Sequence, residues 1–463
     1  MSPRLLALTS LLMLSVAAAG QARRPEKTSG VPLIKHVVII FQENRTPDNL
    51  FQDPVLISRG ADIATQGLDS KGQLITLQPG SLIQNYDLGH SHIGFTLQYD
   101  KGKMDASDKA FVYCPKTATK CPCSNYAIQH KISCPLSNPV YSYVDPAEVQ
   151  PYFQLAEQYT FNDRMFQTNQ GPSFPAHQII ISGTSAPTAT SNLFVAENVV
   201  PEGARAGCIA KPGNTVLLID PQGNETQSMY PCTEHASLTD LLKNAGISWR
   251  YYTPSAGSIW TGPNGIEHMC GPNNPPPNAT ACLGADWNNV SMPPSNVLSD
   301  ISNGQLAQVS WVVPSGDASD HANGNIGLGP SWVAAIVNAI GSSAYWQDTA
   351  IFITWDDWGG WYDHVAPPIL NSYEYGFRVP LIVVSPYAKP AYISHVTHDF
   401  GSILQFIEHT YSLPSLGYAD ATATSLSDCF NFKQKPLAYK TIAAPVAPSY
   451  FLNSADTSDP DDD

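Results

Sequence analysis

Four short stretches of the chain are mostly apolar, and acidic or amide residues follow closely after three of them, 34–41, 308–313 and 350–355. The four stretches cover residues 34–41, 308–313, 350–355 and 379–385. Because they are short and rich in β-branched and aromatic side chains, they predict strands buried on both faces of a sheet. Such strands are typical of parallel sheets covered by helices.

Helix signals lie between these strands. Thr46-Pro47-Asp48 has the pattern of a helix start, and Ser237 with Gly246 brackets a helix that leads into a strand at 247–252. Further helices are predicted from a capping pattern at 145–148, from an amphipathic stretch at 330–340, and at 399–411. The alternation predicts an α/β fold, a three-layer sandwich with a largely parallel central sheet.

The remaining segments are rich in turn residues. Residues 254–296 are dense in Pro, Asn and Gly and are predicted to be an insertion or lid. Residues 23–32 are expected to be a flexible lead-in, and the acidic residues 451–463 a disordered tail. One catalytic domain is therefore expected over residues 33–450, with loop-rich insertions.

Two adjacent carboxylates end the strand at 350–355. Asp356 and Asp357 are followed by a Gly-Gly turn and then by Asp363-His364, and no Lys or Arg lies within residues 349–365. Acids at the carboxyl end of a buried strand lie where open α/β sheets bind ligands. Because adjacent carboxylates repel each other, they need a cation, a proton or a basic neighbour. A bound metal is the leading interpretation, and an acidic Gly turn is the alternative.

The strand at 34–41 ends in the same way, at Glu43 and Asn44. Glu43, Asn44, Asp356 and Asp357 would supply an all-oxygen ligand set. Such a set favours one hard divalent ion, Ca, Mg or Mn, with Zn also open. The alternative for Asn44 is a turn residue that bonds its own backbone.

Ser173 and several loop histidines are the other candidate reactive groups. Ser173 lies in a Gly-Pro-rich bend, where nearby backbone N–H groups can hold an anion. The surroundings are not the G-x-S-x-G pattern of α/β-hydrolases. His90, His321 and His364 follow or precede acids in loops. The alternative for Ser173 is a serine that only favours the turn. The alternative for each histidine is a solvent-exposed side chain without a catalytic role.

Composition narrows the classes of function. Of 463 residues only 14% are charged, Pro and Gly number 39 and 32, and the net charge is −15. The acidic balance argues against a nucleic-acid partner but not against a phosphate site, because a local metal can outweigh the global field.

The first 22 residues have the pattern of a secretory signal peptide. Arg4 precedes the apolar residues 5–16, and small residues follow. Arg23-Arg24 lies after the apolar part, so the pattern is not a twin-arginine signal. A secreted or periplasmic protein with no transmembrane segment is expected, and the sequence carries no signal for an oligomeric state.

Nine cysteines indicate disulfide bonds in an oxidising compartment. Cys114 and Cys134 are candidates for a locally closed loop, while the pairing of the others stays open. The odd count leaves one thiol unassigned.

A resemblance covers residues 34–413. The blocks that carry it are, in order, HVVIIFQENRTPDNLF, GKMD, GPS with SGTS, SDH, ITWDDWGGWYDHVAPP and RVPLIVVSPYA. The chain resembles the secreted phosphoesterase family of bacterial phospholipases C and related acid phosphatases. The resemblance implies an alkaline-phosphatase-like α/β core and one divalent metal. The implied metal ligands are Glu43, Asn44, Asp356 and Asp357, with Ser173 as the metal-bound nucleophile. His90, His321 and His364 would line the phosphate, and His177 and Asp320 would contact substrate.

Several positions depart from the family pattern. Ser173 stands where Thr is frequent, and Ala176-His177 where Asn-Arg is frequent. Asp356-Asp357-Trp358 replaces Asp-Glu-His, and Asp399-Phe400 replaces Asp-His. These changes bear on substrate preference more than on the core chemistry.

The expected function is hydrolysis of phosphate esters through a phosphoseryl intermediate on Ser173. An acid-phosphatase-like activity is favoured, because the chain lacks the C-terminal extension of many of these phospholipases. One alternative is a phospholipase C that cleaves phospholipid head groups. Another, from a different class, is a secreted metal-stabilised binding protein without turnover.

Overall fold

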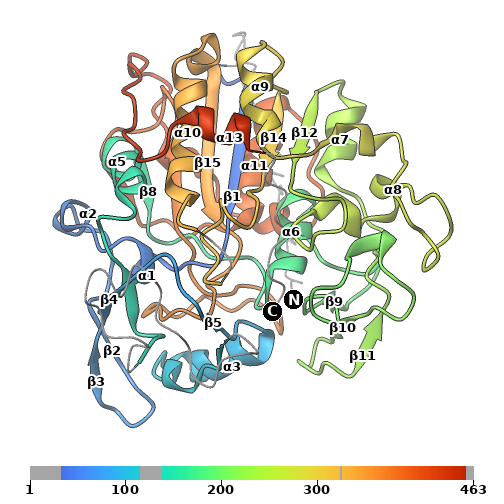
Figure 1. The fold of residues 1–463 in the computed structure, drawn as a ribbon, viewed down its shortest axis with the longest axis horizontal. Coiled ribbons are helices and arrows are strands. Elements are labelled where there is room, and N and C mark those ends of the chain that lie inside the picture. The colour runs from blue at the N-terminus through green and yellow to red at the C-terminus, as the bar shows by residue number, and fades with distance from the viewer. Residues whose placement is uncertain (1–32, 115–137, 324–325, 455–463) are drawn as a thin grey trace, which may run out of the picture. The chain divides into compact units, whose positions relative to one another are not determined.

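An eight-stranded sheet forms the centre of the computed structural model, which describes residues 33–114, 138–323 and 326–454 (Figure 1). The strand order is β13-β12-β14-β1-β15-β16-β8-β17. In chain order these are β1 (His36–Gln42), β8 (Thr160–Asn162), β12 (Trp249–Tyr252), β13 (Val290–Ser291), β14 (Val309–Val312), β15 (Thr349–Trp355), β16 (Leu381–Val384) and β17 (Tyr392–Ser394). Among these strands only β16 runs antiparallel to its neighbours, so the predicted, largely parallel sheet is confirmed.

The two strands that carry the predicted oxygen ligands lie side by side. β1 pairs in parallel with β15, and Gln42 is opposite Trp355 in the register. Glu43 therefore leaves the sheet next to Asp356. Both strands are almost completely buried, as their continuous apolar sequences predict.

Helices cover both faces of the sheet. Trp355 contacts Tyr152 of α5, whereas Phe352 contacts Phe406 of α11. Residues 352 and 355 of one strand point to opposite faces, so these helices lie on opposite sides and the three-layer arrangement is confirmed. One group of helices comprises α5 (Gln150–Gln158), α9 (Asn296–Ser302), α10 (Gly329–Gly341) and α13 (Pro448–Asn453). The other comprises α6 (Ser173–Ser182), α7 (Leu238–Asn244), α11 (Phe400–Tyr411) and α12 (Ala419–Thr422).

Shorter elements fill the connections. The helices are α1 (Pro47–Leu50), α2 (Pro54–Ser58), α3 (His92–Tyr99) and α8 (Glu267–Cys270). The small strands are β2 (Gln66–Leu68), β3 (Leu74–Thr76), β4 (Gln78–Gly80), β5 (Asp87–Leu88), β6 (Val112–Tyr113), β7 (Ser142–Val144), β9 (Phe194–Val195), β10 (Val216–Ile219) and β11 (Gln227–Met229).

One predicted helix start and the predicted end of the domain need correction. The helix expected from Asp145 begins only at Gln150, because the Asp145 carboxylate closes a turn by accepting from the backbone of Ala147 at 2.9 Å. The expected end of the domain at residue 450 falls inside α13, where Phe451 is buried against Trp332. Local polar patterns mark turns as readily as helix starts, since both leave backbone groups that need partners.

Residues 254–296, the segment predicted as an insertion, contribute one strand to the central sheet. The segment contains α8 and ends with β13, which extends the sheet beyond β12. Whether it acts as a lid stays a prediction.

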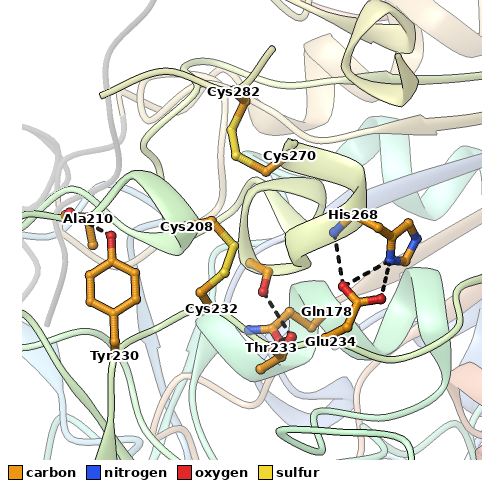
Figure 2. Close-up of a disulfide and its surroundings, with 11 residues drawn as sticks. Gln178, Cys208, Ala210, Tyr230, Cys232, Thr233, Glu234, His268, Cys270 and Cys282 are labelled. Atoms are coloured by element: carbon orange, nitrogen blue, oxygen red, sulfur yellow. Dashed lines mark hydrogen bonds and ion pairs between the residues drawn. A yellow bond between two sulfur atoms is a disulfide. The ribbon is translucent and has the colours of Figure 1, made fainter. Parts of the chain in front are cut away.

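Two disulfide bonds lie in this segment or in the chain that precedes it. Cys208 pairs with Cys232, and Cys270 with Cys282, near the Glu234–His268 ion pair (Figure 2). Cys114 is also disulfide-bonded, but the predicted partner Cys134 lies outside the described residues. Among the described cysteines the unassigned thiol is Cys429, which is buried.

None of the helices in the described ranges is long and apolar enough to cross a membrane.

Candidate active site

The tips of β1 and β15 meet in a tight arrangement. The Asn44 backbone N–H donates to Asp356 Oδ1 at 2.9 Å, and Asn44 has a left-handed backbone with φ 61°. Gly359 also has a positive φ of 59°, and a Cβ on it would lie 2.5 Å from the Asn44 carbonyl oxygen. The Gly359-Gly360 turn therefore lets the chain after Asp357 pass directly over Asn44.

Ser173 lies beside the same carboxylates. It is the first residue of α6, and its hydroxyl donates to Asp357 Oδ2 at 3.4 Å. Asp357 Oδ1 accepts from the Gly359 N–H at 2.7 Å, which fixes the carboxylate. The start of a helix favours negative charge, so the serine oxygen lies where an anion is stabilised.

Several buried oxygens at these strand tips have no hydrogen-bond partner among the described residues. They are Glu43 Oε2, Asn44 Oδ1 and Asp356 Oδ2. Burial, together with the neighbouring Asp356, raises the pKa of the Glu43 carboxyl well above its usual range, and the same two causes raise the pKa of Asp357. Unpartnered buried acceptors are costly, and a divalent cation is what this donor set fits.

His90 orients the Asn44 amide. Its Nδ1 lies 2.7 Å from the Leu88 carbonyl, which only accepts, so Nδ1 carries the proton. The other nitrogen, Nε2, then accepts from Asn44 Nδ2 at 3.2 Å. This leaves Asn44 Oδ1 as the atom available to a cation. The His321 ring lies 6.1 Å from the His90 ring, so two of the three predicted phosphate-lining histidines come together.

His177 faces the carboxylates directly. Its Nε2 lies 3.1 Å from Glu43 Oε1 and 3.9 Å from Asp356 Oδ2, and all three side chains are fully buried. The sequence predicts a substrate contact for His177, but here the imidazole lies against two of the predicted metal ligands.

Asp320 and His364 bond to other side chains. Asp320 is fully buried, and its Oδ2 accepts from Tyr152 Oη and Trp355 Nε1 at 2.8 and 2.9 Å. Burial raises the pKa of Asp320 to about 6. Asp320 Oδ2 thus holds two core aromatic side chains, while Oδ1 has no hydrogen-bond partner among the described residues, and the substrate contact stays a prediction.

His364 belongs to a separate ionic cluster. Its Nδ1 lies 2.7 Å from Asp48 Oδ2 and its Nε2 lies 2.9 Å from Asp62 Oδ1. The guanidinium of Arg378 bonds Asp48 and Asp363 in the same cluster. Both imidazole nitrogens are engaged by carboxylates, so His364 offers no free nitrogen to a phosphate here. The negative charge that acts on His364 comes mainly from Asp48 and less from Asp363, its neighbour in the sequence.

Trp260 is a site residue that sequence reasoning missed. Its ring stacks on His177 at 6.4 Å and lies 6.1 Å from the His321 ring. It comes from the segment read as an insertion. A lone Trp in a Pro-rich and Asn-rich stretch carries no periodic signal, so only the fold reveals that it covers the histidines.

Comparison with known proteins gives a family. The chain matches the Phosphoesterase family over residues 34–414. It belongs to that family. The chain is 24% identical to Phospholipase C B of Mycobacterium tuberculosis, over 87% of this chain and 78% of that protein. It is also 24% identical to the Non-hemolytic phospholipase C of Burkholderia pseudomallei, over 88% of this chain and 60% of that protein. The protein is therefore a hydrolase that acts on phosphoric ester bonds.

A solved structure shows a weaker similarity. A protein in the Alkaline Phosphatase Superfamily from Vibrio parahaemolyticus matches with a TM-score of 0.35 and 11% identity, over 86% of this chain and 72% of that chain. That score is too low to support an inference about the site.

Proposed function

We propose that this protein hydrolyses phosphate esters with Ser173 as nucleophile and a divalent cation held by Glu43, Asn44, Asp356 and Asp357. The observation that carries the proposal is the Ser173 hydroxyl at 3.4 Å from Asp357 Oδ2, next to buried oxygens without partners. A bound divalent cation lowers the pKa of the serine hydroxyl and neutralises charge on the phosphoryl oxygens.

The chain's own groups supply the remaining steps. Asp357 accepts the hydroxyl proton as Ser173 Oγ attacks phosphorus and the alkoxide leaves. His321, whose ring lies 6.1 Å from that of His90, stabilises the equatorial oxygens or protonates the leaving group, whereas both nitrogens of His90 are used in holding the Asn44 amide. Water then releases phosphate from the phosphoserine.

Two substrate classes fit this site. One is a phosphomonoester, the substrate class expected from the resemblance to acid phosphatases. A phospholipid substrate is the second candidate, supported by relatives named phospholipase C over most of the chain. Hydrolysis of p-nitrophenyl phosphate and of phosphatidylcholine vesicles, compared at equal enzyme concentration, separates the two.

The nucleophile is tested by Ser173→Ala. We expect the variant to fold and to lose more than about 1,000-fold in kcat on either substrate. Ser402→Ala is a matched control, because Ser402 is also a buried serine in the first turn of a helix, where it bonds only Asp399. Equal activity of Ser173→Ala and Ser402→Ala would show that the nucleophile lies elsewhere.

Export from the cytoplasm is part of the same proposal. The disulfides Cys208–Cys232 and Cys270–Cys282 fit an oxidising compartment. N-terminal sequencing of protein recovered outside the cytoplasm is expected to give a start between residues 17 and 23. A start at Met1 would contradict the signal peptide.

A further inference from the structure

His177 occupies an unusual position for a neutral imidazole. It is fully buried, and both of its nitrogens lie near polar atoms. Nδ1 lies 3.3 Å from Tyr251 Oη, and Nε2 lies 3.1 Å from Glu43 Oε1. The placement of the ring proton decides what Nε2 does there.

The partners of Tyr251 assign that proton. The Tyr251 hydroxyl is 2.9 Å from the Trp260 carbonyl oxygen, which only accepts, so the single hydroxyl proton is used there. Tyr251 Oη is then an acceptor toward His177, and Nδ1 must carry the ring proton. Nε2 consequently directs its lone pair at the two acids.

A lone pair facing two carboxylates is unfavourable unless a proton or a metal cation lies between them. Glu43 Oε1, Asp356 Oδ2 and His177 Nε2 belong to a group whose ligand atoms all lie within 4.8 Å of one another. Adjacent ligand atoms around a metal at about 2.1 Å lie roughly 3 Å apart, as the Nε2 and Glu43 Oε1 atoms do at 3.1 Å. Glu43 Oε2 and Asp356 Oδ2 have no hydrogen-bond partner among the described residues.

The ring is also held in place for this role. Phe41 packs edge-on against it at 4.8 Å, and Trp260 stacks on its face at 6.4 Å. A ligating histidine usually donates its second ring N–H to a fixed acceptor, which Tyr251 provides here.

We propose that His177 Nε2 is a metal ligand, so that the centre is a mixed nitrogen–oxygen site selective for a divalent transition metal such as Zn²⁺ over Ca²⁺ or Mg²⁺. Imidazole favours transition metals, whereas carboxylate and carbonyl oxygens alone suit the hard cations. The inference rests on the proposed metal site and specifies which metal that site takes.

Pulsed EPR of the full chain, freed of metal with chelator and loaded with one equivalent of Mn²⁺, tests the ligand directly. The native protein is expected to show ¹⁴N modulation from a bound imidazole, and His177→Gln to lose it. His235→Gln is the matched control, because His235 is another buried histidine, bonded to Ala186 O and Ser182 Oγ instead of acids. It is expected to retain the modulation.

Calorimetry with Zn²⁺ and Ca²⁺ tests selectivity. We expect His177→Gln to weaken Zn²⁺ binding by more than about 100-fold, because loss of an outer partner alone costs about 10–100-fold. Ca²⁺ binding should change much less. Should His177→Gln fail to fold, the double variant His90→Gln/His321→Gln serves in its place, because it removes the other two histidines of the site. Retained ¹⁴N modulation there supports His177, and its loss overturns the inference.

The experiments distinguish failure of the His177 inference from failure of the proposed metal site. Metal binding without ¹⁴N modulation, or with modulation that survives in His177→Gln, overturns the inference and leaves the proposed metal site intact. Absence of any stoichiometric metal binding by the native protein overturns both.

Discussion

At the scale of single residues, the candidate site depends on two positions with left-handed backbone. Asn44 turns the end of β1 so that its N–H bonds Asp356, and Gly359 lets the following loop approach it. Asparagine tolerates this conformation better than most residues, and glycine adopts it without cost from a Cβ. Side-chain chemistry alone would not place the four predicted ligands together.

Gly359→Ala is expected to destabilise the protein and abolish phosphoesterase activity. The added Cβ would meet Asn44 at 2.5 Å, whereas at Gly246, which also has a positive φ, nothing lies within 4 Å. Backbone strain of about 1–2 kcal/mol plus overpacking of about 1–3 kcal/mol applies at Gly359, and only the strain at Gly246. Denaturant unfolding and p-nitrophenyl phosphate turnover of both variants provide the measurement. Equal losses in the two variants would contradict a close-contact role for Gly359.

At the scale of elements, a partly buried ionic cluster links the loop after β15 to the segment around α1 and α2. Arg378 bonds Asp48 and Asp363, and His364 bonds Asp48 and Asp62. Burial by itself lowers the pKa of His364, but the hydrogen bond and charge of Asp48 outweigh it and raise the pKa to about 9.

This shift predicts a pH dependence of stability. Because the folded-state pKa of His364 is raised above its unfolded value of about 6.5, its contribution is complete below that pH. The contribution is lost as the pH rises through about 9. His364→Gln should therefore lower the melting temperature more at pH 6 than at pH 9.5.

Thermal unfolding at both pH values checks this expectation. His395→Gln is the comparison variant, since His395 also pairs with an acid, Asp163, but its side chain is 56% exposed. An exposed pair contributes little, so a small effect at both pH values is expected. A loss for His364→Gln that does not vary with pH would contradict the assignment.

At the scale of the whole molecule, the disulfide bonds and a bound cation are expected to increase the free energy of unfolding beyond the contribution of core packing. The Cys208–Cys232 bond closes a separation of 24 residues and Cys270–Cys282 one of 12. They lie on either side of Trp260 in the sequence.

Replacing Cys208 and Cys232 together by serine is expected to cost about 3 kcal/mol, from the chain entropy that the cross-link removes in the unfolded state. The Cys270/Cys282 double variant, with the shorter loop, should lose slightly less. Denaturant unfolding measures both. An unchanged free energy of unfolding in both double variants would contradict a stabilising role.

Metal removal should lower the melting temperature as well as activity. A ligand at 100 times its Kd stabilises the folded state by about 2.7 kcal/mol. Asp357→Asn removes one of the mutually repelling buried acids, so its metal-free form should melt higher than metal-free native protein and respond less to added Zn²⁺ or Mn²⁺. A native melting temperature that ignores both chelator and metal would contradict the metal site.

Much of the fold followed from local patterns. The apolar runs at 34–41 and 350–355 predicted buried parallel strands, and Ser237 with Gly246 marked a helix that forms as α7. The adjacency of Glu43 and Asp356 was also predictable, because the carboxyl ends of parallel strands share one edge of a sheet. Hydrophobic periodicity and helix-ending residues are local features, so they can be recognised in the sequence alone.

The directions of side chains were decided only by tertiary structure. His364 was expected to line the phosphate, and Asp320 and His177 to contact substrate. Packing puts His364 between two carboxylates and Asp320 Oδ2 against Tyr152 and Trp355. It turns His177 toward Glu43. A residue type states which bonds a side chain can form, whereas burial and the nearest competing partner decide which bond it makes. Both of those depend on segments hundreds of positions away in the chain.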